Sequence, residues 1–243
     1  MHTADILVIG ATFCGCAIAL NSNKTVIVAE SGFVLGSEFA QSMNQKRPKK
    51  TQFCTDLGKT FECELKKRGL LNENGEIYAQ PAVFVLSALL KEKGTDVRLN
   101  TVVTDIQIKD DGYLVTLFES EGFYNLTVKT IIDTTSTGVF CTFPREKCLC
   151  TTVQGKGDIQ NEITGAGCSI VALKEEDTWY TAREKALKRA KTDGEKIIMT
   201  ANAFAYRDQV NMQSAPYGTF LPSDGFYNLT DAFEGGAAYA EKL

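Results

Sequence analysis

Glycine residues near the start of the chain are spaced as in a dinucleotide-binding loop. Gly10 and Gly15 bracket Thr12 and Phe13 in the segment Gly-Ala-Thr-Phe-Cys-Gly, and Glu30 follows at about the 20 residues that the motif requires. The first glycine permits a tight turn, and the last lets a helix approach a sheet with its amino end facing a diphosphate. Glu30 can accept hydrogen bonds from ribose hydroxyls, and the Thr12 hydroxyl can donate to a phosphate oxygen.

The residues around this loop favour a βαβ unit. Residues 5–10 and 25–30 are short apolar runs, typical of strands buried in a parallel sheet. Residues 13–20 are small and apolar, which suits a short helix packed on that sheet after a right-handed crossover. The alternative is a Rossmann-like unit that has lost its ligand.

The rest of the chain predicts a mixed fold. Periodicity and capping residues predict helices over 56–68, 82–93, 181–191 and 228–243, with Asn228 or Thr230 capping the last. Apolar runs and turn signals predict strands over 96–105, 106–109, 113–119, 124–129, 130–133, 150–153 and 170–173. We therefore expect an α/β fold: a Rossmann-like domain with a central parallel sheet and a β-meander (residues 1–138 and 204–243), plus a small α+β cap (residues 139–203).

Histidine and cysteine usage excludes several kinds of chemistry. The only histidine is His2, so an imidazole base or a histidine-ligated zinc is not available. Cys14 and Cys16, like Cys148 and Cys150, are separated by one residue and form no C-x-x-C pair. We expect reduced thiols and no metal site. A cofactor that carries its own reactivity suits such a chain.

Charge and hydropathy argue against two classes of partner. The net charge of -4 and the pI near 5.2 provide no basic field for nucleic acid, and the Lys-rich stretch 46–50 is too short to change this. No apolar run is long enough to span a bilayer, and no signal peptide is evident. We expect a cytoplasmic protein that binds neither nucleic acid nor membrane.

Taken together, these segments resemble the FAD-dependent oxidoreductases of the glutathione-reductase-like flavoprotein superfamily. The similarity is strongest to bacterial members whose first loop reads Gly-Gly-Thr-Pro-Ala-Gly. Residues 35–38 (Leu-Gly-Ser-Glu) stand where the family has a Gly-Gly turn beside the adenosine and diphosphate. The residue matching Val103 offers backbone hydrogen bonds to adenine in that family, and residues 131–138 are similar to its Ile-Asp-Ala-Thr-Gly strand and turn.

The end of the chain extends this resemblance. Residues 221–225 and 228–233 are similar to the family's final flavin-contacting loop and helix, in which an Asp meets the ribityl-diphosphate and the helix amino end meets the pyrimidine. Asp224 is the candidate for that Asp; a turn acid beside Gly225 is the alternative. The resemblance implies FAD as cofactor, bound by Gly10, Thr12, Phe13, Gly15, Glu30, Ser31, Ser37, Glu38, Val103, Thr134, Thr135, Asp224, Asn228 and Leu229.

Three functions remain open at this point. The first is an FAD-dependent oxidoreductase that moves hydride or electrons from a small organic substrate to an acceptor. The second is a non-catalytic flavoprotein-like subunit of a larger oxidoreductase complex, which the changes at Thr12 and Ser136 favour. The third, a nicotinamide-binding Rossmann protein, agrees less well with the β-meander and the C-terminal segment.

The residues that would contact substrate are the least defined. Arg207 lies in the densest polar cluster, residues 206–213, and could bind a substrate carboxylate through both guanidinium nitrogens. The alternative is a surface arginine paired with Asp208. A dimer mate or a partner subunit could complete the substrate pocket.

Overall fold

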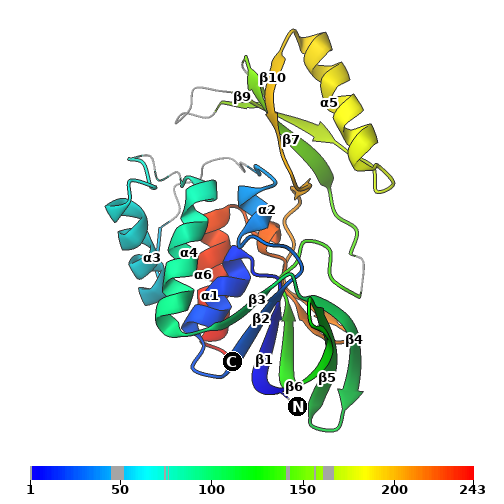
Figure 1. Cartoon of the computed structure of the whole chain (residues 1–243). Helices are drawn as coiled ribbons and strands as arrows, with labels where there is room; N and C mark the ends of the chain where they lie inside the picture. The colour runs from blue at the N-terminus through cyan, green and yellow to red at the C-terminus, as the bar shows by residue number, and fades with distance from the viewer. Residues whose placement is uncertain are drawn as a thin grey trace.

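The computed structural model describes residues 2–44, 52–73, 75, 77–140, 143–155, 157–160 and 167–243. The Lys-rich stretch 46–50 lies outside these residues. The described residues form two sheets, and Figure 1 shows the larger one with its helices in the lower part of the view and the smaller one above it. We call the smaller sheet with its helix the cap.

The larger sheet has eight strands in the described residues. These are β1 (His2–Ile9), β2 (Val26–Glu30), β3 (Asp96–Leu99), β4 (Val102–Lys109), β5 (Gly112–Glu119), β6 (Gly122–Asp133), β12 (Gln213–Ala215) and β13 (Gly218–Phe220). Strands β13, β6, β1, β2 and β3 run parallel in that order. The last four residues of β1 are Ile6, Leu7, Val8 and Ile9, and all are buried because helices cover one face and the meander the other.

Helices cover one face of this sheet. They are α1 (Phe13–Asn21), α3 (Asp56–Lys67), α4 (Ala79–Lys93) and α6 (Leu229–Ala240), while the short α2 (Ser37–Ala40) and the 3-10 turn η1 (Ser223–Gly225) lie at the amino end of α1. Helix α1 is buried on all sides from Phe13 to Leu20, between the sheet, α4 and α6. A side chain at Gly236 of α6 would meet the Cys14 carbonyl oxygen at 2.3 Å, so glycine there lets α6 lie directly against α1.

Strands β4, β5 and the first half of β6 form the antiparallel meander on the other face. Alternate residues Val115, Leu117, Leu126 and Val128 point into the core between meander and parallel sheet. Strand β4 pairs with β5 alone in the described part of the chain, which leaves it one open edge.

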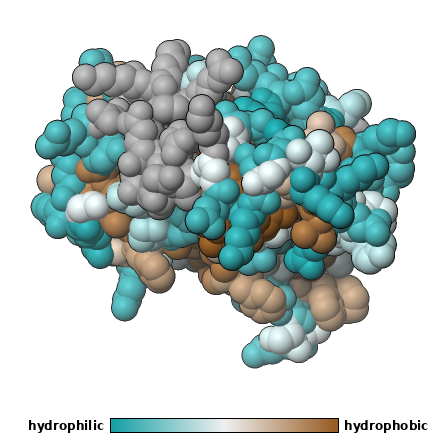
Figure 2. Space-filling view, turned by 90° about the horizontal axis from the view of Figure 1, so that it is seen from above, coloured by the Kyte–Doolittle hydropathy of each residue, from teal (hydrophilic) through white to brown (hydrophobic). Residues whose placement is uncertain are grey.

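The cap consists of a five-stranded antiparallel sheet and one helix, as far as the described residues show. Its elements are β7 (Lys147–Gln154), β8 (Ile159–Gln160), β9 (Gly167–Ala172), α5 (Trp179–Asp193), β10 (Lys196–Thr200) and β11 (Ala205–Tyr206). Helix α5 packs through Ala182, Ala186 and Ala190, whose small side chains allow a close approach to β7 and β9. Seen from the cap side, Figure 2 shows mainly hydrophilic residues with smaller apolar areas between them.

Several elements differ from the sequence-based prediction. The strand predicted over 96–105 is interrupted at Asn100, whose φ of 53° is in the left-handed region, so β3 and β4 are separate strands. The two strands predicted over 124–133 are one 12-residue strand, β6, which joins the meander to the parallel sheet. Strand β11 lies within the range 204–243 that is predicted to belong to the Rossmann-like domain, yet it pairs with β7 of the cap. None of the helices described is long and apolar enough to cross a membrane.

Candidate functional site

The carboxyl ends of the parallel strands meet at one edge of the larger sheet. Strand β1 connects to β2 on one side, whereas its other neighbour, β6, comes from later in the chain. The strand order therefore changes direction between β1 and β6, where α1 begins. In open α/β sheets, ligands bind outside the carboxyl ends of the strands at such a switch point.

The two glycines of the loop have the structural roles that the spacing predicts. Gly10 has a φ of 93°, which L side chains rarely adopt, and turns the chain from β1 toward α1. A side chain on Gly15 would meet the Gly10 carbonyl oxygen at 2.4 Å and the Thr134 hydroxyl at 2.7 Å. Glycine at both positions therefore lets the first turn of α1 pack directly on the end of β1.

The Thr12 hydroxyl, predicted to donate to a phosphate oxygen, makes its hydrogen bonds within the protein in this structure. It accepts a hydrogen bond from the Gly15 backbone N–H at 2.9 Å and so caps α1. It donates its proton to the Thr134 hydroxyl at 2.7 Å, and Thr134 in turn donates to the backbone oxygens of Ile9 and Gly10. Thr12 and Thr134 thus join α1 to the end of β6, and the Thr12 proton is committed inside the protein.

Glu30 lies at the end of β2, as predicted, with its side chain turned toward the loop. One carboxylate oxygen accepts from the Ala11 N–H at 2.9 Å and the other from the Gly32 N–H at 2.7 Å. Ser31 is exposed beside it, and its hydroxyl lies 3.5 Å from the same oxygen that Gly32 contacts. The oxygen that Ala11 contacts has a second lone pair that can accept from a ribose hydroxyl.

Glu38 is buried at the amino end of α1. Ser37 and Glu38 form the first turn of α2, and Gly36 precedes them with a φ of 61°. The Glu38 carboxyl accepts from the Phe13 N–H at 2.8 Å and from the Ser223 hydroxyl at 2.7 Å. Burial raises the pKa of Glu38 to about 8, and the negative charge of Asp224 adds to the increase, while the hydrogen bonds from Ser223 and Phe13 oppose it.

The amino end of α1 therefore has several of its N–H groups paired within the protein. The Cys14 N–H donates to the Ser223 hydroxyl at 3.2 Å, in addition to the contacts of Phe13 with Glu38 and of Gly15 with Thr12. These contacts bring α2 and η1 against the helix end. The sequence pattern placed these residues near a cofactor but gave no sign that they bond one another.

A hollow of about 260 Å³ lies where β3 passes into β4. It is lined by Arg98, Leu99, Asn100, Thr101, Glu119 and Ser120. The Thr101 N–H donates to the Glu30 backbone oxygen, so this segment is attached to the end of β2. Val103 follows on β4, with its side chain buried against the sheet and its backbone on the strand with the open edge.

Asp133 organises the turn after β6. It accepts from the N–H and hydroxyl of Thr135 at 3.0 and 2.6 Å, from the Val139 N–H at 2.8 Å and from the Tyr217 hydroxyl at 3.1 Å. Burial raises the pKa of Tyr217 to about 12, and the Asp133 charge contributes. Thr135 is thus fixed beside Gly10, where a side chain on that glycine would touch it.

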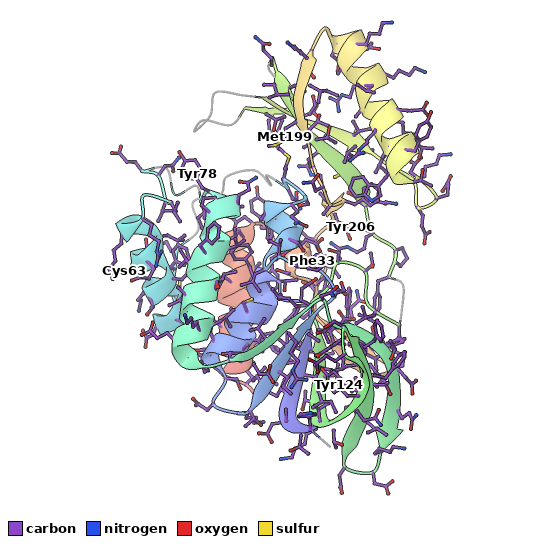
Figure 3. All side chains as sticks on the ribbon, in the orientation of Figure 1. Phe33, Cys63, Tyr78, Tyr124, Met199 and Tyr206 are labelled. Atoms are coloured by element: carbon purple, nitrogen blue, oxygen red, sulfur yellow. The ribbon has the colours of Figure 1, made fainter. Side chains whose placement is uncertain are left out.

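Arg145 is the site residue that the sequence analysis missed. Its guanidinium is 1% exposed and donates to Asp208 at 2.7 Å, to Asp224 at 3.0 Å and to the Ser136 carbonyl oxygen. It also lies over the Tyr206 ring, at 5.3 Å from the centroid. Figure 3 shows Tyr206 where the larger sheet and the cap meet. Arg145 belongs to no motif, and only its burial among carboxylates identifies it.

These contacts correct one of the two interpretations of Arg207, namely its pairing with Asp208. Asp208 pairs with Arg145 and not with Arg207. Arg207 lies at the end of β11, where its charge acts on Asp158 and on the Cys168 thiol of the cap. Burial raises the pKa of Tyr206, and the negative charge of Asp224 adds to the increase.

The C-terminal candidates lie at the same edge of the sheet. Asp224 is 1% exposed in η1, directly after the turn that follows β13. Asn228 caps α6 by accepting from the Asp231 N–H at 2.8 Å, and Leu229 is buried in the first turn. The cap of α6 by Asn228 is confirmed.

The cysteines in the described residues are all free, and Cys14 and Cys16 are fully buried in α1. Burial raises the thiol pKa of both, and the charge of Glu38 adds to it, so neither is a reactive thiolate at neutral pH. Across the described part of the chain, no group of three or more Cys, Asp, Glu or His side chains is arranged to hold a metal ion.

The fold is similar to solved structures of oxidising enzymes. Glycine oxidase from Geobacillus kaustophilus matches with a TM-score of 0.62 and 12% identity, over 100% of this chain and 95% of that one. For p-nitrophenol 4-monooxygenase from Pseudomonas putida, the TM-score is 0.59 and the identity 16%, over 99% of this chain and 78% of that one. A flavoprotein/dehydrogenase from Cytophaga hutchinsonii matches with a TM-score of 0.58 and 14% identity, over 99% of this chain and 77% of that one.

At these identities the similarity shows a shared fold. The predicted fold class, an α/β Rossmann-like unit with a β-meander and a small α+β cap, is confirmed. A scan of the sequence against protein-family models gives no match, and neither does a comparison with curated proteins.

Proposed function

We propose that this chain binds FAD along the carboxyl edge of the larger sheet and is an FAD-dependent oxidoreductase of the glutathione-reductase-like superfamily. The observation that carries the proposal is the start of α1 at the switch point between β1 and β6, with Glu30 at the end of β2. That arrangement provides a positive helix end for a diphosphate and an acid for a ribose. Shared fold with a flavoprotein/dehydrogenase, a monooxygenase and glycine oxidase supports it.

The residues at this edge fit such a cofactor. Glu38 Oε2 and Arg145 Nη2 are buried and lack a hydrogen-bond partner among the described residues, so a bound polar group would satisfy them. Glu30 and Ser31 would hold the adenosine ribose, and the open edge of β4 at Val103 would face adenine. Gly10, Phe13, Gly15, Ser37 and Glu38 would surround the diphosphate, with Thr12, Thr134 and Thr135 supporting the loop, and Asp224, Asn228 and Leu229 would lie toward the flavin.

In this proposal, bound FAD supplies the acceptor of hydride or electrons, and the protein binds, orients and excludes water. Arg145 links the segment that enters the cap to η1, and so it holds the cap over the carboxyl edge. Tyr206 covers the Arg145 guanidinium, and burial raises its pKa above the ordinary value, so the phenol stays neutral well into the alkaline range. We propose a small organic substrate, bound between the cap and the sheet edge.

A second candidate is a flavoprotein-like subunit without catalysis of its own. The observation that favours it is that Glu38 and Ser223 already accept from N–H groups at the start of α1. A diphosphate would otherwise accept from these N–H groups directly. We also propose that a second copy or a partner subunit completes the substrate pocket. Light scattering of the FAD-loaded protein would give the mass of the assembly directly.

Anaerobic reduction of the bound flavin tests the enzyme proposal. FAD-loaded protein is mixed with amino acids, phenols and hydroxy acids, and the visible flavin absorption band is followed. Bleaching of the band by one substrate class, at a rate that saturates with concentration, is the expected result. A protein that retains FAD but is reduced only by dithionite would support the subunit instead, and tight binding of NAD in place of FAD would support a nicotinamide-binding protein.

A further inference from the structure

Glu38 is placed where a bound diphosphate would bring its negative charge. One oxygen of its carboxyl accepts from the Phe13 N–H at 2.8 Å, at the first residue of α1, and from the Ser223 hydroxyl at 2.7 Å. The other oxygen, Oε2, is buried and has no hydrogen-bond partner among the residues that the structure describes. The side chain is 5% exposed, so water does not screen its charge.

The charged and titratable groups that face Glu38 do not compensate for a carboxylate there. From η1, Asp224 contributes a second negative charge. From α1, the Cys14 and Cys16 thiols face it as neutral groups, and Glu30 of β2 acts on Cys16 as well. Arg145 donates to Asp224 and Asp208, and no Lys or Arg in the described ranges forms an ion pair with Glu38.

At this helix end, the protonated and ionised forms of Glu38 are therefore close in free energy even without a ligand. The amino end of α1 and two hydrogen bonds favour the carboxylate, whereas burial and Asp224 favour the acid, and the pKa of Glu38 is raised to about 8. A diphosphate at the same helix end adds negative charge, which favours the protonated form of Glu38, as burial and Asp224 do. Its binding must raise the pKa of Glu38 further.

We propose that Glu38 serves the cofactor site as a neutral acid, and that binding of the dinucleotide to the ionised form of the protein takes up one proton at this side chain. The inference rests on the proposed function, since it requires FAD to bind at the start of α1. The neutral acid removes the repulsion between carboxylate and diphosphate. Its Oε2 hydroxyl also becomes a donor, and an anionic oxygen would satisfy this orphaned buried atom.

The test is the FAD dissociation constant as a function of pH, measured by quenching of flavin fluorescence between about pH 6.5 and 9. For the wild-type chain we expect affinity to be constant below pH 7.5 and about tenfold weaker at pH 9 than at pH 7, because a proton must then be taken up. Glu38→Gln keeps a neutral side chain and should bind FAD with the same affinity at both pH values. Ser223→Ala removes a hydrogen bond that favours the carboxylate, so the pH at which affinity begins to fall should rise.

Calorimetry provides a measurement that needs no variant. FAD is titrated into the wild-type chain at about pH 8.5 in two buffers that differ in ionisation enthalpy, and we expect an uptake of more than half a proton per FAD bound. Binding without proton uptake would overturn the proposal, and so would a Glu38→Gln variant that loses affinity with pH as the wild type does. Absence of FAD binding over the whole pH range would instead overturn the proposed function, which distinguishes the two failures.

Discussion

The guanidinium of Arg145 donates to the carboxylate of Asp224 at 3.0 Å, and both side chains are 1% exposed. Arg145 lies on the segment that enters the cap, and Asp224 lies in η1 at the edge of the larger sheet. A second hydrogen bond joins Arg145 to Asp208, which follows β11 on the way out of the cap. One buried cation therefore connects both passages between the two sheets to the candidate cofactor site.

Replacing Arg145 by Met should destabilise the protein strongly. The substitution leaves Asp208 and Asp224 without their cation, and breaking a buried pair from one side typically costs about 3–5 kcal/mol. The free energy of unfolding from urea titration is the measurement. Arg68→Met is the matched control, because Arg68 is 46% exposed and pairs only across 3.6 Å with Glu64, so its loss should cost less than about 1 kcal/mol. Equal stability of the two variants would contradict the role of Arg145.

Glu38→Gln should change how stability depends on pH. Because the folded state raises the pKa of Glu38 from an unfolded value of 4.5 to about 8, its contribution to stability is present below pH 4.5 and is lost as pH rises to 8. The variant has no such loss. The free energy of unfolding of the variant minus that of the wild type should therefore increase by on the order of 1–3 kcal/mol from pH 5 to pH 8. Glu176→Gln, at a side chain that is 73% exposed, should show no such trend, and parallel curves for Glu38→Gln would refute the claim.

Glu30→Ala should weaken the binding of FAD by about 1.5–3 kcal/mol, the range of hydrogen bonds to a charged group, without unfolding the protein. Glu30 also accepts from Ala11 and Gly32, so Glu30→Gln, which keeps one acceptor oxygen, should lose less affinity. Flavin fluorescence titration at pH 7 is the measurement, with Glu176→Ala as control. An unchanged dissociation constant in Glu30→Ala would place the ribose elsewhere.

Much of the fold could be predicted because local pattern and tertiary structure agree. Gly10, Gly15 and Glu30 occur at spacings that only a strand, turn, helix and strand in order explain, and these elements form as predicted. Gly94 ends α4 in the left-handed conformation that glycine adopts without strain. Such signals depend on neighbours in sequence, which a single chain displays.

The candidate site could be predicted only in part, since its contacts join distant residues. Glu38 and Ser223 are 185 positions apart and Arg145 and Asp224 are 79 apart, so no local spacing relates them. The hydrogen bond from the Thr12 hydroxyl to Thr134, the residue that follows β6, likewise joins residues 122 positions apart. Polar partners of this kind are fixed by strand order, and a sequence pattern does not specify which of them bond.

Chelation and thiol alkylation should leave any flavin reduction intact. The described residues hold no group of metal ligands, and Cys14 and Cys16 are buried with raised thiol pKa values, so neither EDTA nor iodoacetamide has a target at the site. The rate of substrate-driven flavin reduction is compared before and after each reagent. Loss of reduction with EDTA would reveal a metal. Loss with iodoacetamide while FAD stays bound would implicate a cysteine, with Cys14→Ser and Cys16→Ser as the next variants.

FAD binding itself is the most direct test of the central claim. Flavin-free wild-type protein is titrated with FAD in a calorimeter at pH 7, followed by gel filtration and an absorption spectrum of the protein fraction, with FMN and NAD titrated in parallel. We expect one FAD per chain, a flavin band that elutes with the protein, and weaker binding of FMN and NAD because neither presents both the flavin and the adenosine ends to the site. No heat of FAD binding and no flavin band on the protein, in a sample that is folded by circular dichroism, would contradict it.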